Sequence, residues 1–225
     1  MAESMPDSRS GDPGSKAYLG RRVPAGAPAR TMPRFIIVTG TPGVGKTILC
    51  KQLANKTGFA LLSLSDLVKK GRLHIGFDPQ ARSYLINEPA VRKTLGDYFE
   101  NRRLKGVVFE THSLTGILPA ETRGMFAVVL RLDPIVLARR LKARKWPKLK
   151  VWENVEAEFI DFSLYDALKI LGRARVIEID GTGKRPEELV RNILRTLSRR
   201  RRWNPKSSPN WLSKYDPILL SRTVL

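Results

Sequence analysis

The fold is decided by RFIIVTGTPGVGKTILCKQLA, residues 34–54. Its centre, GTPGVGKT at 40–47, matches the pattern G-x-x-x-x-G-K-[ST] completely. The apolar run before it predicts a buried strand, and the apolar spacing after it predicts a helix that stops at Gly58. A strand, a glycine-rich turn and a helix in this order predict a phosphate-binding loop (P-loop), because the glycines let successive N–H groups point at phosphate oxygens.

The P-loop residues predict a site for ATP and Mg²⁺. Lys46 would place its charge on the β- and γ-phosphates, and the Thr47 hydroxyl would ligate Mg²⁺ at the positive end of the following helix. An accidental glycine-rich turn ending in Lys-Thr is the alternative, and it leaves the flanking strand and helix unexplained. The predicted nucleotide-binding residues are Gly43, Val44, Gly45, Lys46, Thr47, Ile48 and, from farther along the chain, Arg144.

Apolar patterns from residue 34 to 198 alternate between strands and helices. This predicts an α/β fold with a five-stranded, mainly parallel sheet and helices on both faces. Asp133 is a predicted N-cap before Pro134, and Ser65 or Asp66 is predicted to cap a helical turn after the second strand. GRLHIGFDP, residues 71–79, is interpreted as a loop, and His74 within it as a structural residue. The strands are expected at 34–40, 59 onward, 106–112, 125–132 and 175–183, and the main helices at 46–58, 88–105, 134–144, 151–172 and 185–198.

The ends of the chain differ in composition from its middle. Residues 1–33 are rich in Gly, Pro, Ser and Ala, which predicts a disordered extension, and Met32 is an alternative start. Residues 34–198 are predicted to form one P-loop domain, and residues 199–225 a basic tail. The single cysteine excludes a disulfide framework, and the two histidines offer no zinc spacing. No apolar run approaches the roughly 18 residues needed to span a bilayer, so a cytoplasmic protein is expected.

A second chemical motif follows the strand GVVFETH, residues 106–112. Ligands of open α/β sheets lie beyond the carboxyl ends of the strands, so Glu110 and His112 should lie near the P-loop. Glu110 would hold the water shell of Mg²⁺ or orient an attacking group, and His112 would donate to phosphate or move a proton. A purely structural His112 is the alternative.

The stretch ARRLKARKWPKLK, residues 138–150, carries basic side chains and no acid. Such a charge block between two helices predicts a lid, about residues 140–150, that folds over phosphates. A plain RNA-binding surface uses the same side chains and stays an alternative. The net charge of +20 favours polyanionic partners such as ATP, RNA or a ribosomal particle, although general solubility would also explain it.

Several of these motifs together resemble the adenylate kinase isoenzyme 6 family, small P-loop kinases and ATPases of small-ribosomal-subunit assembly. The resemblance covers residues 34 to about 215 and includes IGFD at 75–78, VIEIDGTGKRPEELV at 176–190 and PNWLSKY at 209–215. Its most specific part is the series Arg140, Arg144, Trp146, Lys150, Asn154, Glu156 and Glu158. The chain departs from the family at Pro79, Asn87 and Pro89, where acids are common, and at Trp146, where the family has Tyr.

The resemblance implies a nucleoside monophosphate kinase with a short lid that transfers the γ-phosphoryl group of ATP to AMP and also hydrolyses ATP. Lys46, Arg140 and Arg144 would neutralise the phosphates, while Glu110 and His112 would organise metal and water. The acceptor site would lie between residues 59–71 and the helix that begins near Glu88. The acceptor base stays open among AMP, CMP and dAMP.

A competing interpretation is a nucleotide-switched assembly factor that mainly binds rRNA or a small-subunit ribosomal protein and hydrolyses ATP. The tail SRRRRWNPKSSPNWLSKYDP, residues 198–217, favours it, because an arginine run flanked by Trp203 and Trp211 combines phosphate contacts with stacking faces. A disordered, solubilising tail is the alternative.

Overall fold

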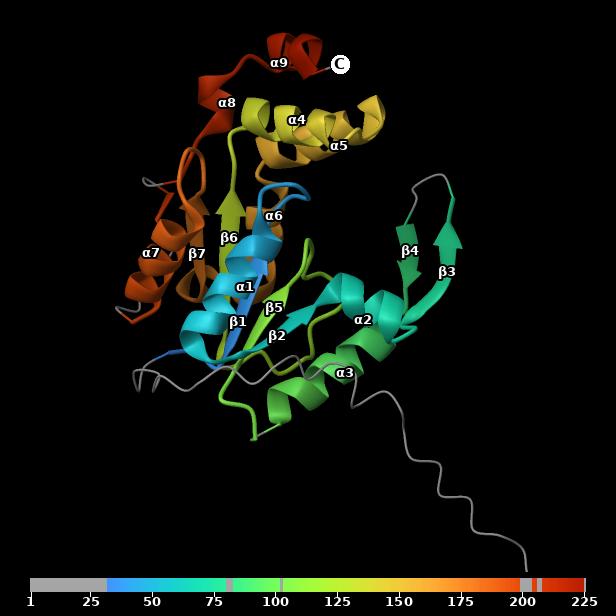
Figure 1. Ribbon diagram of the computed structural model, residues 1–225, viewed down its shortest axis with the longest axis vertical. Helices are drawn as coiled ribbons and strands as arrows, with labels where there is room; N and C mark the ends of the chain where they lie inside the picture. The colour runs from blue at the N-terminus through green and yellow to red at the C-terminus, as the bar shows by residue number, and fades with distance from the viewer. Residues whose placement is uncertain (1–31, 80–82, 102, 199–203, 206–207, 225) are drawn as a thin grey trace, which may run out of the picture.

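The structure is a computed structural model that describes residues 32–79, 83–101, 103–198, 204–205 and 208–224 (Figure 1). Almost all of the predicted N-terminal extension and the arginine run 199–202 with Trp203 lie outside the described residues. The elements in chain order are β1 (Phe35–Thr39), α1 (Lys46–Thr57), β2 (Ala60–Ser63), α2 (Leu64–Lys70), β3 (His74–Asp78), β4 (Ser83–Ile86), α3 (Glu88–Glu100), β5 (Val107–Glu110), β6 (Met125–Arg131), α4 (Pro134–Ala143), α5 (Lys148–Phe159), α6 (Phe162–Leu171), a 3₁₀ turn (Arg173–Arg175), β7 (Val176–Asp180), α7 (Pro186–Ser198), α8 (Trp211–Lys214) and α9 (Pro217–Val224).

The main sheet has the order β2-β5-β1-β6-β7, and all its strand pairs are parallel. Strand β1 lies at its centre, with Val38 opposite both Glu110 of β5 and Val128 of β6. The end of β1, where the P-loop begins, therefore lies beside the end of β5. The predicted five-stranded parallel sheet is confirmed.

Helices cover both faces of this sheet because β1 sends alternate side chains to opposite sides. Ile36 and Val38 pack with buried residues of α1, α4, α5 and α7, whereas Phe35 and Ile37 pack with those of α2, α3 and α6. Both sets are almost fully buried. In this doubly wound arrangement, α4 and α5 lie beyond the carboxyl edge of the sheet (Figure 1).

The prediction of one long helix over 151–172 is wrong. Helix α5 ends at Phe159 and α6 begins at Phe162, and Asp161 between them adopts a left-handed conformation with φ of 60°. The Asp161 carboxylate forms an ion pair with the buried guanidinium of Arg131 on β6. This contact spans 30 residues of sequence, so helical periodicity along 151–172 gave no sign of the break.

Three smaller expectations also need correction. The segment interpreted as a loop at 71–79 contains β3, which forms an antiparallel hairpin with β4. The N-cap of helix α2 is Ser63, two or three residues before the predicted Ser65 or Asp66, and its side chain makes no capping bond. Ile48, one of the apolar residues whose spacing predicted helix α1, is 56% exposed. By contrast, Asp133 caps α4 as predicted, accepting from the backbone N–H groups of Ile135 and Val136.

The described end of the chain is packed against α4 and α5 (Figure 1). Trp211, Leu220 and Val224 are buried in the same cluster as Leu141 and Val151. These contacts give the PNWLSKY stretch a structural role.

The same region holds a polar cluster at the start of α4. The Asp133 carboxylate accepts hydrogen bonds from Lys214 Nζ at 2.6 Å and from the Tyr215 hydroxyl at 2.5 Å. Burial by itself would raise the pKa of Asp133, but these two bonds, the backbone N–H of Val136 and the charge of Lys214 outweigh it and lower the pKa. Among the described residues, none of the helices is both long enough and apolar enough to span a bilayer.

Candidate nucleotide site

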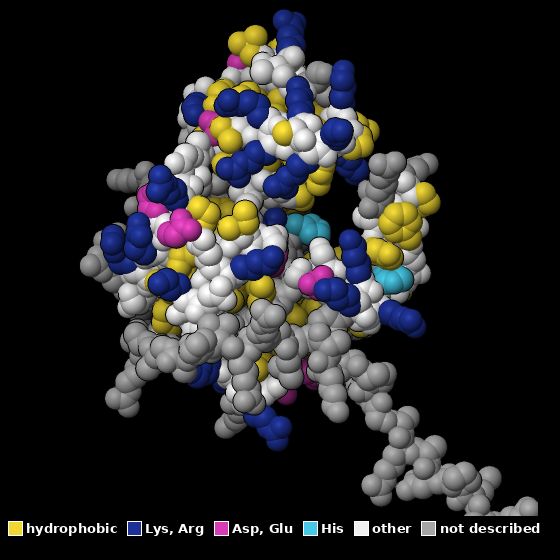
Figure 2. Space-filling view, viewed as in Figure 1, with side chains coloured by type: hydrophobic (Ala, Val, Ile, Leu, Met, Phe, Trp, Pro, Cys, Tyr) yellow, Lys and Arg dark blue, Asp and Glu magenta, His cyan; other side chains and the backbone are white. Residues whose placement is uncertain are grey.

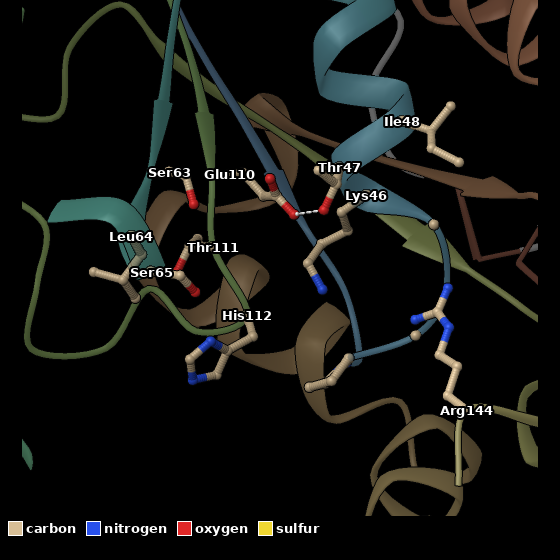
Figure 3. A pocket seen from close by; sticks show the side chains of 13 residues that line it. Lys46, Thr47, Ile48, Ser63, Leu64, Ser65, Glu110, Thr111, His112 and Arg144 are labelled. Atoms are coloured by element: carbon tan, nitrogen blue, oxygen red, sulfur yellow. Dashed lines mark hydrogen bonds between the residues drawn. The ribbon is translucent and has the colours of Figure 1, made fainter. Parts of the chain in front are cut away.

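A cavity of about 260 Å³ opens at the carboxyl ends of β1, β2 and β5. Figure 3 shows Lys46 pointing into its middle, with His112 and Arg144 on opposite sides. The lining residues are Pro42, Gly43, Gly45, Lys46, Thr47, Ile48, Ser63, Leu64, Ser65, Glu110, Thr111, His112 and Arg144. Most of the predicted site residues are therefore brought together here from distant parts of the chain.

The loop between β1 and α1 has the shape of a phosphate cradle. Gly43 and Gly45 adopt positive φ angles of 98° and 115°, which side chains disfavour. A Cβ atom on Gly43 would also lie only 2.7 Å from Cδ2 of Leu141 on α4. Glycine is therefore required both for the turn and for the close approach of α4.

Lys46 is buried, and its ammonium group is held by the loop itself. Nζ donates to the carbonyl oxygens of Gly40 at 2.6 Å and Thr41 at 3.1 Å. Burial lowers the pKa of Lys46 to about 8, although Glu110 acts in the opposite direction. The positive charge thus lies in a poorly solvated position, where an incoming phosphate would interact with it strongly.

Thr47 and Glu110 form the pair expected of a magnesium site. The Thr47 hydroxyl donates to Glu110 Oε1 at 2.6 Å, shown by the dashed line in Figure 3. Across the described residues no group of three or more His, Cys, Asp or Glu side chains is placed to hold a metal. A hydroxyl and one carboxylate nevertheless fit Mg²⁺, which usually keeps several waters and binds substrate phosphates.

His112 lies on a loop that the buried carboxylate of Asp166, on α6, holds in place. Asp166 accepts from the backbone N–H of Leu114 at 2.6 Å, and also from the hydroxyls of Ser113 and Thr115. Burial and the nearby Lys46 lower the pKa of His112, against the opposing effect of Asp166. This shift favours the neutral imidazole, which has one N–H donor and one nitrogen that accepts.

The two predicted lid arginines occupy different positions. Arg144, at the end of α4, lines the cavity, whereas Arg140 donates from Nη1 to the backbone carbonyl of Val44 at 3.0 Å. Val44 is buried, and neither Val44 nor Arg140 is among the residues that line the cavity. Arg140 therefore holds the outer side of the P-loop, and Arg144 reaches its open side.

Some site residues were missed from the sequence. Ser63, Leu64 and Ser65 line the cavity because β2 ends beside β5. Asp166 does not line it, but supports the loop after His112 through its bond to Leu114, 52 residues away. The end of a predicted parallel strand was a usable signal for Ser63. No local pattern pointed to Asp166.

A parallel sheet with a P-loop after its central strand and a helical hairpin above it defines a P-loop NTPase of the nucleoside monophosphate kinase type. The crystal structure of a gluconokinase from Sinorhizobium meliloti has this fold, with a TM-score of 0.50 and 22% sequence identity, covering 76% of this chain and 94% of that one. A family model described as an AAA domain matches residues 36–161.

Two archaeal proteins, each named "Putative adenylate kinase", are similar in sequence. The Thermococcus kodakarensis protein is 39% identical over 186 residues, which are 82% of this chain and 97% of the relative. The Pyrococcus furiosus protein is 39% identical over 167 residues, or 73% and 84% of the two chains. The chain belongs to this family, the adenylate kinase isoenzyme 6 family.

The lowered pKa of Lys46 predicts how ATP binding changes with pH. The protonated ammonium is the form that would bind phosphate, so the dissociation constant for ATP should stay level well below pH 8 and rise as the pH passes 8, by up to about tenfold per unit. Titration calorimetry between pH 7 and 9.5 measures this. Lys46→Arg keeps its charge throughout and should bind with little pH dependence. A level wild-type profile up to pH 9.5 would contradict the prediction.

Proposed function

We propose that the protein is a Mg²⁺-dependent kinase that transfers the γ-phosphoryl group of ATP to AMP, forming two molecules of ADP, and that it also hydrolyses ATP. The observation that carries this is the Thr47–Glu110 pair beside the buried Lys46, at a cavity that His112 and Arg144 border. The names of the archaeal relatives support adenylate kinase chemistry.

The side chains have distinct roles in this proposal. Bound Mg²⁺ would neutralise charge on the phosphates, and the Thr47 hydroxyl and Glu110 carboxylate are the groups that would hold it. Lys46 would exchange its bonds to the Gly40 and Thr41 carbonyls for bonds to phosphate oxygens. His112 would donate a hydrogen bond to a phosphate oxygen when AMP, whose attacking group is a phosphate oxygen, is the acceptor, and in ATP hydrolysis it would accept the proton of the attacking water. Arg144 would neutralise phosphate charge from the other side.

The acceptor would bind where the cavity reaches the end of β2. Ser63 and Ser65 supply hydroxyl groups there. At the start of α3, Arg92 donates from Nη2 to the carbonyl of Gly116 at 2.6 Å, which ties α3 to the loop that follows His112. These contacts support an acceptor site between residues 59–71 and α3.

A coupled assay of ADP formation from ATP and AMP tests the proposal. Lys46→Ala should abolish turnover, and His112→Ala should lower kcat by about 100-fold, the scale of losing one preorganised hydrogen-bond donor to the transferring phosphate. Wild-type turnover no faster than that of Lys46→Ala would refute the kinase. Omitting AMP from the same assay gives the ATPase rate.

A second candidate function is binding to small-subunit ribosomal RNA or protein in the cytoplasm, with ATP hydrolysis as the switch. Figure 2 shows lysine and arginine side chains gathered over α4, α5 and α9, and Arg139, Lys142, Lys145 and Lys148 of this surface are exposed. Such a surface suits a phosphate backbone. ATPase activity that rises with purified small subunits and ignores AMP would favour this function, and Lys142→Glu with Lys145→Glu should abolish the rise. Lys51→Glu and Lys56→Glu, exposed on α1, are the control.

A further inference from the structure

Glu158 is a buried acid in the helical hairpin whose role the site described above leaves open. It lies near the end of α5 and is 1% exposed. Its Oε1 accepts from Arg131 Nε at 2.7 Å and from the backbone N–H of Leu132 at 3.1 Å. Its Oε2 accepts from the Thr41 hydroxyl at 2.6 Å. One carboxylate thus joins α5, β6 and the P-loop.

Thr41 is the P-loop residue that receives this contact, and it also touches Lys46. It is 2% exposed, and its carbonyl oxygen accepts from Lys46 Nζ at 3.1 Å and from the backbone N–H of Val44 at 3.3 Å. The Thr41 side chain therefore bonds to α5 while its main chain bonds to the catalytic lysine. Holding Thr41 in place therefore sets the direction of its carbonyl group, which orients the Lys46 ammonium.

Charge around Glu158 keeps this link strong. Arg131 is fully buried and pairs with Glu158, Asp161 and Glu178. Burial raises the pKa of Glu158, but Arg131 and the hydrogen bonds from Thr41 and Leu132 oppose this shift and favour the carboxylate. A hydroxyl that donates to a buried carboxylate makes a stronger bond than one that donates to a neutral acceptor.

We propose that Glu158 is a positioning residue for the nucleotide site: through Thr41 it holds the first turn of the P-loop in its phosphate-binding shape and couples that shape to helix α5. Because α5 is the second helix of the hairpin that carries Arg144, the Glu158 carboxylate also connects this hairpin to the P-loop. The inference rests on ATP binding at the P-loop, and does not depend on which acceptor is phosphorylated.

Thr41→Val tests the link, because it removes the hydroxyl and leaves the Arg131–Glu158 pair in place. The dissociation constant for ATP should rise about tenfold, as expected for the loss of one hydrogen bond to a charged group. The KM for AMP should stay within about twofold of wild type, since the acceptor lies elsewhere in the cavity. Thr41→Ser keeps the hydroxyl and should restore ATP affinity to within about twofold of wild type.

A matched control separates this role from simple stabilisation of the buried cluster. Glu178→Gln removes another carboxylate from Arg131 but leaves Thr41 and Glu158 joined, so it should lower the melting temperature without weakening ATP binding. If Thr41→Val does not fold, Glu158→Gln replaces it, because the amide oxygen can still accept from Arg131 while the NH2 group, which cannot accept, takes the place of the oxygen that accepts from the Thr41 hydroxyl.

The outcomes distinguish this inference from the proposed function. ATP affinity of folded Thr41→Val or Glu158→Gln within about twofold of wild type would overturn the positioning role, as would Thr41→Ser binding as weakly as Thr41→Val. Normal ATP binding by the wild type without phosphorylation of AMP would instead refute the kinase and leave the positioning role standing. Calorimetry for affinity and thermal melting for stability provide both readouts.

Discussion

Replacing Glu110 by alanine is expected to lower the rate of ADP formation by about 100-fold or more, the scale of losing one preorganised electrostatic group. The carboxylate lies 2.6 Å from the Thr47 hydroxyl, and together they offer oxygen atoms for Mg²⁺ beside Lys46. The half-saturating Mg²⁺ concentration should rise along with the loss of rate. Steady-state kinetics over a Mg²⁺ titration measure both quantities.

Glu110→Asp is the matched control, because it keeps the charge while shortening the side chain by one methylene. It should retain far more activity than Glu110→Ala and a Mg²⁺ requirement close to that of wild type. Thr47→Ala combined with Glu110→Ala should cost less than the sum of the two single changes, because both side chains serve one ion. Additive losses, or an unchanged Mg²⁺ requirement in Glu110→Ala, would separate Glu110 from the metal.

The second large effect concerns stability. Arg131→Met should lower the free energy of unfolding by about 3–5 kcal/mol, because removing one partner of a buried ion pair leaves uncompensated charge. Arg131 is 1% exposed and pairs with Glu158, Asp161 and Glu178. Urea denaturation at pH 7 measures the loss. A change below about 1 kcal/mol would show that the cluster does not need its cation.

The same variant has a predictable pH dependence. Burial already raises the pKa of Glu158, and removing Arg131 takes away the main opposing effect. A group whose folded pKa is raised contributes most stability below its unfolded pKa, about 4.3 for Glu, and loses that contribution as the pH rises through the folded value. The deficit of Arg131→Met should therefore be smaller at pH 5 than at pH 8.

Arg175→Met is the control for this pH effect. The Arg175 guanidinium donates to the carbonyl oxygens of Leu171 and Thr122, not to a carboxylate. Its removal should cost less, and equally at both pH values. A deficit of Arg131→Met that does not change between pH 5 and pH 8 would contradict the charge argument.

The sequence alone was enough to predict the elements whose signals are local. A P-loop pattern between an apolar strand and a helix specifies its own turn, because glycines set the backbone and neighbouring residues supply the N–H groups. The Asp133 cap and the parallel sheet follow similarly from caps and periodicity within a few residues. Placing Glu110 and His112 near the loop needed only the rule that ligands lie at the carboxyl edge of such sheets.

The tertiary structure alone decided the features that depend on long-range contacts. The break at Asp161 comes from its ion pair with Arg131, and the anchoring of Thr41 by Glu158 joins residues 117 positions apart. The burial of Trp211 and the hydrogen bonds from Lys214 and Tyr215 to Asp133 likewise hold the segment around α8 against the start of α4. Helical periodicity and composition carry no information on such pairs, because a buried charge is stable only where the fold brings its partner. The sequence thus determined where phosphate would bind, and the fold decided which buried groups hold that loop in place.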